Sequence, residues 1–210
     1  VAVIYFFRTE IILMTKSIFT NDDRLIEHRK LATYLIIATI PVIFAGLIFS
    51  DIIQQRIFSI SSIAISNLFF AVILLFAFLT RKSNKNLFQL TLYGALFIGI
   101  VQCFALIPGA SRSGTAITAA LLIGMNLKDS SKFSFMLGIP TILGALVLLI
   151  IEIQTLDITY NSMNLFIGFF VSMIFAFFTI KLFLDFVEKI GMIPFVTYRI
   201  FLAALLFLLI

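Results

Sequence analysis

The sequence contains no tryptophan, a single cysteine and few charged residues, and each shortage narrows what the protein can be. Because Cys103 is the only cysteine, the chain cannot form an internal disulfide or a metal cluster of the CxxC kind. Cys103 lies within an apolar stretch and is predicted to be a small buried core residue. Without tryptophan, the five tyrosines are the only large aromatic residues with polar atoms suited to a lipid–water interface.

Charged residues make up 12% of the chain and apolar residues 62%, with a mean hydropathy of +1.19. Soluble domains carry about 25% charged and about 45–50% apolar residues. The apolar residues are gathered in long blocks, a pattern that suits a bilayer. The sequence therefore predicts an integral membrane protein. The net charge is +5, and the Lys and Arg residues lie in short loops between the apolar blocks, where they are expected to set the orientation in the membrane. No nucleic-acid partner is expected.

Several apolar segments are long enough, or nearly so, to cross about 30 Å of hydrocarbon, which takes roughly 20 helical residues. The predicted spans are Leu31–Phe49, Ile57–Leu79, Leu87–Ile107, Phe133–Ile151, Leu165–Phe183 and Ile193–Ile210. The first apolar stretch, Val1–Phe7, is too short to cross and is predicted to be the end of a helix whose beginning is missing. We expect a single all-α transmembrane domain over residues 1–210, a polytopic helical bundle that is incomplete at its N-terminus.

The apolar segment Ala116–Met125 is too short to cross alone, and it follows a polar, glycine-rich break at Pro108–Thr115. Polar, non-helical backbone at membrane depth is tolerated only inside protein or beside a wet cavity. The Lys- and Arg-rich loops all fall on one side only if the chain enters the membrane after residue 87 and returns by residue 125. The sequence therefore predicts a re-entrant helical hairpin at Leu87–Met125, half of an inverted-repeat architecture, with its base at the cytoplasmic face.

The break at the tip of this hairpin has the chemistry of an anion site. Arg112 offers a planar fork of donors that fits phosphate oxygens. A helix begins after the break, so free N–H groups and the positive end of the helix dipole lie at the tip. A structural kink with a paired Arg112 is the alternative, but no carboxylate lies near it in sequence. Hydroxyl side chains and glycines accompany the arginine: Ser111, Ser113, Thr115, Gly109 and Gly114.

Residues 99–114 follow the pattern G-x-x-Q-C-x-A-x-I-P-G-x-S-R-S-G, which closely resembles the second signature of bacterial undecaprenyl-diphosphate phosphatases of the bacitracin-resistance family. Residues 132–140 and 195–200 resemble two further segments of that family, in the same order. The resemblance covers essentially the whole chain. One position differs, because Ala116 stands where the family usually has threonine; Thr115 is the adjacent candidate to replace it, although a shift of one residue turns a helical side chain by about 100°.

The resemblance implies removal of the terminal phosphate of undecaprenyl diphosphate, which regenerates the lipid carrier of cell-wall synthesis and confers bacitracin resistance. It implies a multi-pass protein of the bacterial plasma membrane, with a polyprenyl diphosphate as its partner and a site that opens toward the outer face. Arg112 would bind the diphosphate and stabilise charge on the transferring phosphoryl group. The other residues assigned to the site are Ser111, Ser113 and Thr115 for catalysis, and Gly109, Gly114 and Gln102 for substrate binding.

The family also has a first re-entrant hairpin with paired glutamates, a Ser-Ser-Thr-Gly stretch and a histidine, which these 210 residues do not contain. By resemblance, that hairpin would supply the nucleophile, the acid–base groups and carboxylates able to hold Mg²⁺ or Ca²⁺. The chain itself shows no cofactor or metal ligand set, and we expect it to be inactive alone. A polyprenyl-phosphate transporter or flippase that uses the same anion site is the alternative function. A homodimer is left open.

For three further polar residues, the predicted role is structural or solvent-exposed and not catalytic. Arg199 is predicted to extend to the inner membrane surface, with packing inside the bundle as the alternative. Gln102 is predicted to form a hydrogen bond between helices, with a role in the site as the alternative. His28 lies among charged residues in a basic loop and is predicted to be solvated.

Overall fold

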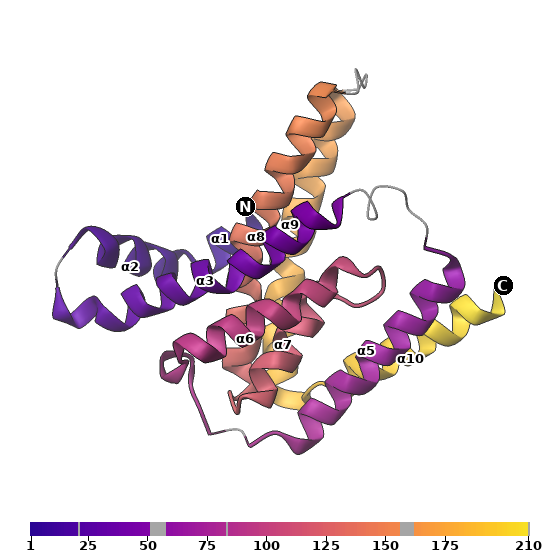
Figure 1. Cartoon of the computed structure of the whole chain (residues 1–210), viewed down its shortest axis with the longest axis horizontal. Coiled ribbons are helices and arrows are strands. Elements are labelled where there is room, and N and C mark those ends of the chain that lie inside the picture. The colour runs from indigo at the N-terminus through magenta and orange to yellow at the C-terminus, as the bar shows by residue number, and fades with distance from the viewer. Residues whose placement is uncertain (21, 51–57, 83, 156–161, 210) are drawn as a thin grey trace.

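The computed structural model describes the whole chain except residues 21, 51–57, 83, 156–161 and 210, and the side chains of 151–155 (Figure 1). Within the described residues the protein is helical and contains no strand. Its α-helices are α1 (Ala2–Phe6), α2 (Arg8–Phe19), α3 (Ile26–Ile48), α5 (Ile60–Thr80), α6 (Leu92–Gln102), α7 (Arg112–Leu122), α8 (Leu127–Thr155), α9 (Ser162–Ile190) and α10 (Ile193–Leu208).

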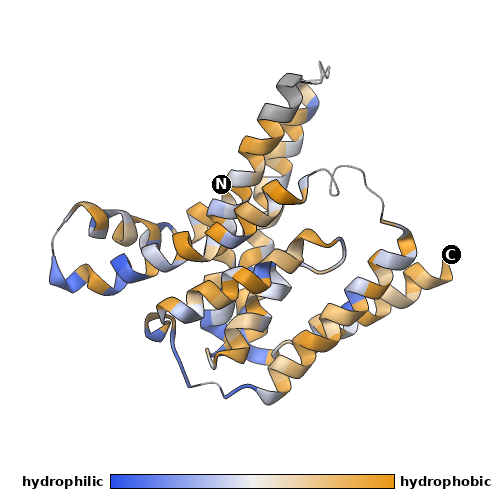
Figure 2. Cartoon of the chain, in the orientation of Figure 1, coloured by the Kyte–Doolittle hydropathy of each residue, from blue (hydrophilic) through white to orange (hydrophobic). Residues whose placement is uncertain are grey.

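Long apolar helices confirm the predicted all-α membrane fold. Four segments of the described chain are long and apolar enough to cross a membrane: Asp23–Ile48, Ile60–Thr80, Leu127–Ile150 and Ser162–Ile190. Figure 2 shows that apolar residues dominate these helices, while the polar residues gather at turns and helix ends. The outer halves of α8 and α9 project beyond the other helices (Figure 1) and expose large apolar side chains, which suits contact with lipid.

Two predicted segments differ from the structure. Leu87–Ile107 is not one continuous span, because α6 begins only at Leu92, where the Thr91 side chain accepts a hydrogen bond from the backbone N–H of Gly94 at 3.1 Å. The charged stretch after Val1–Phe7, expected to be a loop, instead forms α2 and packs beside α3. Arg29 of α3 fixes this packing, since its Nε donates to the carbonyl of Ser17 at 2.8 Å.

Helix α7 lies at the centre of the bundle and belongs to both of its hydrophobic clusters. Ala116, Ala119 and Ala120 face the larger cluster, which includes buried residues of α3, α6 and α8. Ile117 and Leu121 face the smaller cluster, which includes buried residues of α5 and α10. Positions three and four apart lie on one face of a helix, so the sequence of α7 divides it into two apolar faces. Both faces bury their side chains, and this burial fixes the orientation of the helix.

Close backbone approach also positions the α6–α7 region. A Cβ atom on Gly99 of α6 would lie 2.8 Å from the Cα and 2.9 Å from the carbonyl carbon of Ala38 in α3. Those distances are too short for any side chain. Glycine at residue 99 therefore lets α6 pack directly on the backbone of α3.

Candidate functional site

The chain from Lys85 to Asn126 forms a helical hairpin whose two ends meet. The backbone N–H of Lys85 donates to the carbonyl of Gly124 at 3.0 Å, and the N–H of Asn126 donates to the carbonyl of Lys85 at 2.8 Å. Asp129 strengthens this base by accepting from the Asn126 amide at 2.8 Å and from the N–H of Leu87 at 3.1 Å. The chain thus leaves and returns at one place, and the prediction that Leu87–Met125 is re-entrant in a membrane stays a prediction.

The tip of the hairpin has an unusual backbone. Gly109 has φ +93°, and a Cβ there would lie 2.5 Å from the carbonyl oxygen of Ile63 in α5. Ser111 has φ +69° and is the non-glycine residue with positive φ among those the structure describes. Such conformations cost on the order of 1–3 kcal/mol and concentrate at functional sites. Ser111 is also the N-cap of α7, since its Oγ accepts from the N–H of Gly114 at 3.3 Å.

Two backbone donors remain free at this end of α7. The N–H groups of Arg112 and Ser113 donate to no protein atom in the described part of the chain. They point out of the first turn of an α-helix, where the dipole is positive. This geometry favours a bound anion.

Arg112 lies on the side of α7 that faces α8. Its guanidinium group occupies the space left by Gly138, because a Cβ on residue 138 would be 2.7 Å from Nη1 and 2.9 Å from Cζ of Arg112. Nη1 is buried and has no hydrogen-bond partner in the described residues. No carboxylate among those residues forms an ion pair with Arg112. The arginine therefore keeps an uncompensated positive charge and free donors beside the helix N-terminus.

Arg199 of α10 is a second arginine at the tip, and the prediction that it extends to the membrane surface is wrong. Its side chain is buried, and Nε donates to Oδ1 of Asn67 at 2.7 Å. Nη2 donates to the carbonyl oxygens of Gly109 at 2.7 Å and Ala110 at 3.2 Å. Packing inside the bundle, the alternative expectation, is what the structure shows. Asn67, a polar residue within the apolar run of α5, was the sequence signal for a buried polar partner.

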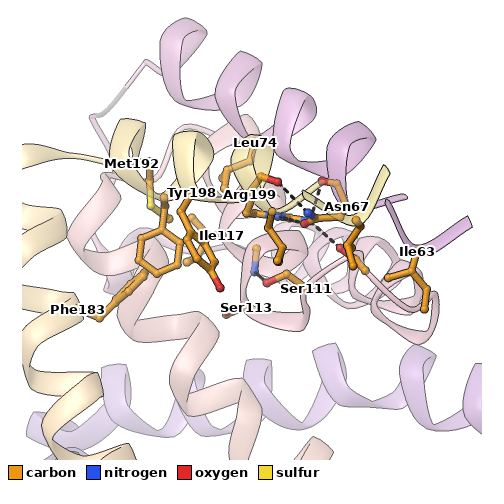
Figure 3. Close-up of a pocket in the computed structure, with 15 residues that line it drawn as sticks. Ile63, Asn67, Leu74, Ser111, Ser113, Ile117, Phe183, Met192, Tyr198 and Arg199 are labelled. Atoms are coloured by element: carbon orange, nitrogen blue, oxygen red, sulfur yellow. Dashed lines mark hydrogen bonds between the residues drawn. The ribbon is translucent and has the colours of Figure 1, made fainter. Parts of the chain in front are cut away.

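A cavity of about 360 Å³ opens between α5, α7 and α10 beside Arg199 (Figure 3). Its polar lining includes Arg199, Asn67, Ser111 and Ser113. Leu74, Ile117 and other apolar side chains form the rest of the wall. The predicted site residues found in this wall are Gly109, Gly114, Ser111 and Ser113.

The remaining predicted site residues lie elsewhere. Arg112 does not line the cavity, because residues 112 and 113 point about 100° apart around a helix. The Thr115 hydroxyl is buried and donates to the carbonyl of Arg112 at 2.9 Å, so it supports the first turn of α7 and does not face the cavity. Gln102 donates to Thr141 Oγ1 at 3.1 Å, which confirms the predicted hydrogen bond between helices. Thr141 lies one turn after Gly138, which places Gln102 toward the Arg112 side of α7.

The structure also shows where His28 lies. His28 lies in the first turn of α3, not in a loop. Its ring is half-buried against Phe88, with ring centroids 5.3 Å apart.

Among the described residues, no three His, Cys, Asp or Glu lie close enough to hold a metal ion. The Mg²⁺ or Ca²⁺ expectation concerned the carboxylates of the family's glutamate-bearing hairpin and stays a prediction, and no chemical step is assigned to a metal.

Known proteins resemble this chain over nearly its full length. The family model described as "Bacitracin resistance protein BacA" matches residues 1–205. A protein of Saccharophagus degradans named undecaprenyl-diphosphatase is 40% identical, covering 100% of this chain and 79% of the relative. Proteins with the same name from Alcanivorax borkumensis and Teredinibacter turnerae are 37% and 41% identical, over 98% and 87% of this chain and 79% and 69% of the relatives. The chain belongs to the bacitracin-resistance BacA family, whose members are bacterial membrane proteins.

Proposed function

We propose that this protein hydrolyses undecaprenyl diphosphate to undecaprenyl phosphate and inorganic phosphate, within the bacterial plasma membrane. Membership of the BacA family and the undecaprenyl-diphosphatase name of its relatives support this reaction over transport. The observation that carries the proposal is the uncompensated guanidinium of Arg112 beside two free N–H groups at the start of α7. A diphosphate supplies the negative charge that these donors lack.

In the proposed overall reaction, water supplies the oxygen that is added to the terminal phosphorus, and the bond from that phosphorus to the bridging oxygen breaks; the attacking nucleophile comes from the family's glutamate-bearing hairpin. Undecaprenyl phosphate leaves with the bridging oxygen. Charge grows on the transferring phosphoryl group and on the leaving oxygen. Arg112 and the N–H groups of Arg112 and Ser113 would stabilise this charge. Ser111 would hold the N-terminal turn of α7 in place, and Ser113 would add a hydroxyl donor.

We infer that the hairpin from Lys85 to Asn126 is re-entrant. α6 and α7 have 11 residues each. Each is therefore only about 16 Å long, roughly half of the hydrocarbon thickness. The residues that flank the base are basic: Lys82, Lys85, Lys128 and Lys132. Lysine-rich loops face the cytoplasm, so the base would lie inside and the site would open toward the outer face.

The nucleophile and the proton-transfer groups are proposed to come from the glutamate-bearing hairpin of the family, placed before Val1. No carboxylate among the described residues lies in an ion pair with Arg112. We call the chain preceded by such a hairpin the extended protein. The chain as given is expected to bind the lipid diphosphate but to release no phosphate, and the extended protein is expected to do both.

The test is phosphate release from undecaprenyl diphosphate in detergent by the extended protein and its variants. Arg112→Ala should lower kcat by about 10²–10³-fold, as expected for loss of a donor arranged for the transition state. Arg112→Lys should also be poor, because lysine keeps the charge but loses the planar fork. Arg81→Ala is the matched control, since Arg81 lies at the end of α5 over the Phe78 ring. A folded Arg112→Ala protein that matches the control would refute the assignment.

A further inference from the structure

The cavity beside Arg199 combines a polar group of side chains with an apolar wall. We propose that it binds the phosphate that remains attached to the lipid, with Arg199 as a second phosphate-binding residue, while Arg112 acts on the phosphate that leaves. This assignment rests on the proposed function. It places the two phosphates of the lipid diphosphate on different sides of the N-terminus of α7. The isoprenoid chain nearest the phosphate would lie along the apolar wall.

The first support is an incomplete set of partners around a buried cation. A guanidinium group has five N–H donors. In Arg199, Nε and Nη2 donate to Asn67, Gly109 and Ala110. Nη1 is buried and has no partner in the part of the chain that the structure describes. The side chain is only 6% exposed, so bulk water does not replace the missing acceptor.

The second support is the direction of this free nitrogen. A Cβ on Gly114 would lie 3.2 Å from Nη1 of Arg199 and 3.1 Å from Oγ of Ser111. Nη1 therefore reaches the first turn of α7, next to the hydroxyl that caps the helix. Since Gly114 has no side chain, the space between the guanidinium group and the helix N-terminus is left clear. Figure 3 shows Arg199, Ser111 and Ser113 between Ile63 on one side of the cavity and Phe183 and Met192 on the other.

The third support is charge. The contacts of Arg199 in the described structure are with neutral groups: the Asn67 amide and backbone carbonyls. No carboxylate there forms an ion pair with it. Two arginines thus flank one helix N-terminus without a protein counter-ion, which fits a ligand with more than one negative charge.

The two arginines differ in their position relative to the apolar wall, because Arg199 lines the cavity and Arg112 does not. Apolar side chains line the cavity on both sides of Arg199 along α10, with Met192 and Phe195 before it and Leu202 and Leu206 after it, and Ile117 adds to them from α7. Such a surface suits an isoprenoid chain and does not suit free phosphate. Arg112 lies on the opposite side of α7, against Gly138, and does not line this wall. The phosphate bound to the lipid is therefore assigned to Arg199, and the terminal phosphate to Arg112.

The test is ligand binding by the chain in detergent, measured by calorimetry with farnesyl phosphate, farnesyl diphosphate and inorganic phosphate. Arg199→Gln should weaken farnesyl phosphate binding at least tenfold, and Arg112→Gln should change it less than twofold. Both substitutions should weaken farnesyl diphosphate binding. Arg81→Gln is the matched control. Arg112→Gln alone should separate the two lipids, and a thermal unfolding curve of Arg199→Gln equal to that of the control would show that its weaker binding does not come from loss of structure.

A second variant keeps the test valid if Arg199→Gln does not fold. Leu202→Trp should fill the apolar wall, so farnesyl phosphate binding should fall while inorganic phosphate binding stays unchanged. Leu205→Trp is the control, because Leu205 is exposed on the same helix. Inorganic phosphate that binds as tightly as farnesyl phosphate and depends on Arg199 would overturn the lipid assignment.

The outcomes also separate this inference from the proposed function. Unmodified chain that binds no farnesyl diphosphate would contradict both. Chain that binds farnesyl diphosphate through Arg112, with Arg199→Gln and Leu202→Trp equal to their controls, would leave the proposed function standing and overturn the role of Arg199.

Discussion

Gly138 of α8 lies directly against the guanidinium group of Arg112. A Cβ on residue 138 would be 2.7 Å from Nη1 and 2.9 Å from Cζ of the arginine. Gly138 sits within one of the segments that resembles the bacitracin-resistance family, but neither composition nor spacing indicates what it touches. The structure explains the glycine: because residue 138 has no side chain, the guanidinium group of Arg112 has room to lie there.

Replacing Gly138 with alanine should therefore displace Arg112. We expect kcat of the extended protein to fall by about 10²-fold, the effect of misplacing a catalytic group by roughly 1 Å. The measurement is phosphate release from undecaprenyl diphosphate. Gly144→Ala in the same helix is the control, since its Cβ would meet its nearest neighbour, Ile43, at an ordinary 3.8 Å. Equal rates for the two variants would show that Arg112 does not depend on this space.

Two substitutions of Ser111, to alanine and to glycine, should differ in their effect on stability but not in their effect on activity. Ser111→Ala removes the helix cap and keeps the positive φ, so it should destabilise the protein by about 0.5–2 kcal/mol. Ser111→Gly removes the same hydroxyl but accepts the positive φ, and it should cost only a few tenths of a kcal/mol. Both should lose a similar factor in turnover, since both lose the hydroxyl. Thermal unfolding in detergent measures the first effect, and a more stable alanine variant would contradict it.

Gly99 should be essential for packing and not for chemistry. Gly99→Ala would force a Cβ against the backbone of Ala38, and overpacking of this kind costs about 1–3 kcal/mol. The melting temperature in detergent should fall, while the affinity for farnesyl diphosphate in the protein that remains folded should not change. Gly46→Ala in α3 is the control, because a Cβ there would meet nothing within 4 Å. A melting temperature equal to that of the control would rule out the close approach.

The re-entrant hairpin predicts which loops share a membrane face. Ser83 and Asn161 lie in two of these loops but outside the described residues, so their neighbours Asn84 and Ser162 are used for labelling. With Cys103 replaced by serine, single cysteines at the two positions should react with an impermeant thiol reagent from opposite sides of the membrane. Reaction from the same side would show that residues 87–125 cross the membrane completely.

The sequence was sufficient for the membrane class and the main helices. The predicted hairpin, Leu87–Met125, ends within a few residues of the bonded base at Lys85 and Asn126. These features depend on local hydropathy and on charges in loops, which a sequence displays directly.

The arrangement of the site was harder to predict because its contacts join distant parts of the chain. Arg199 meets Asn67 across 132 positions and Gly109 across 90. Its position near a helix end suggested a side chain that extends to the membrane surface, and nothing local revealed the acceptors inside the bundle. The separation of Arg112 from Ser113, in contrast, follows from helical periodicity once α7 is known to begin at residue 112.

The closed base of the hairpin has a consequence for the order in which the protein is made. Lys85 bonds with Gly124 and Asn126, so the hairpin cannot close until residue 126 has left the ribosome. By then α5 has been synthesised, and Gly109 can settle against Ile63 of a helix that already exists. Gly138 follows next, and Arg199 is synthesised after it. The buried arginine of the cavity is therefore added only after α5 and the hairpin tip that hold its hydrogen-bond acceptors.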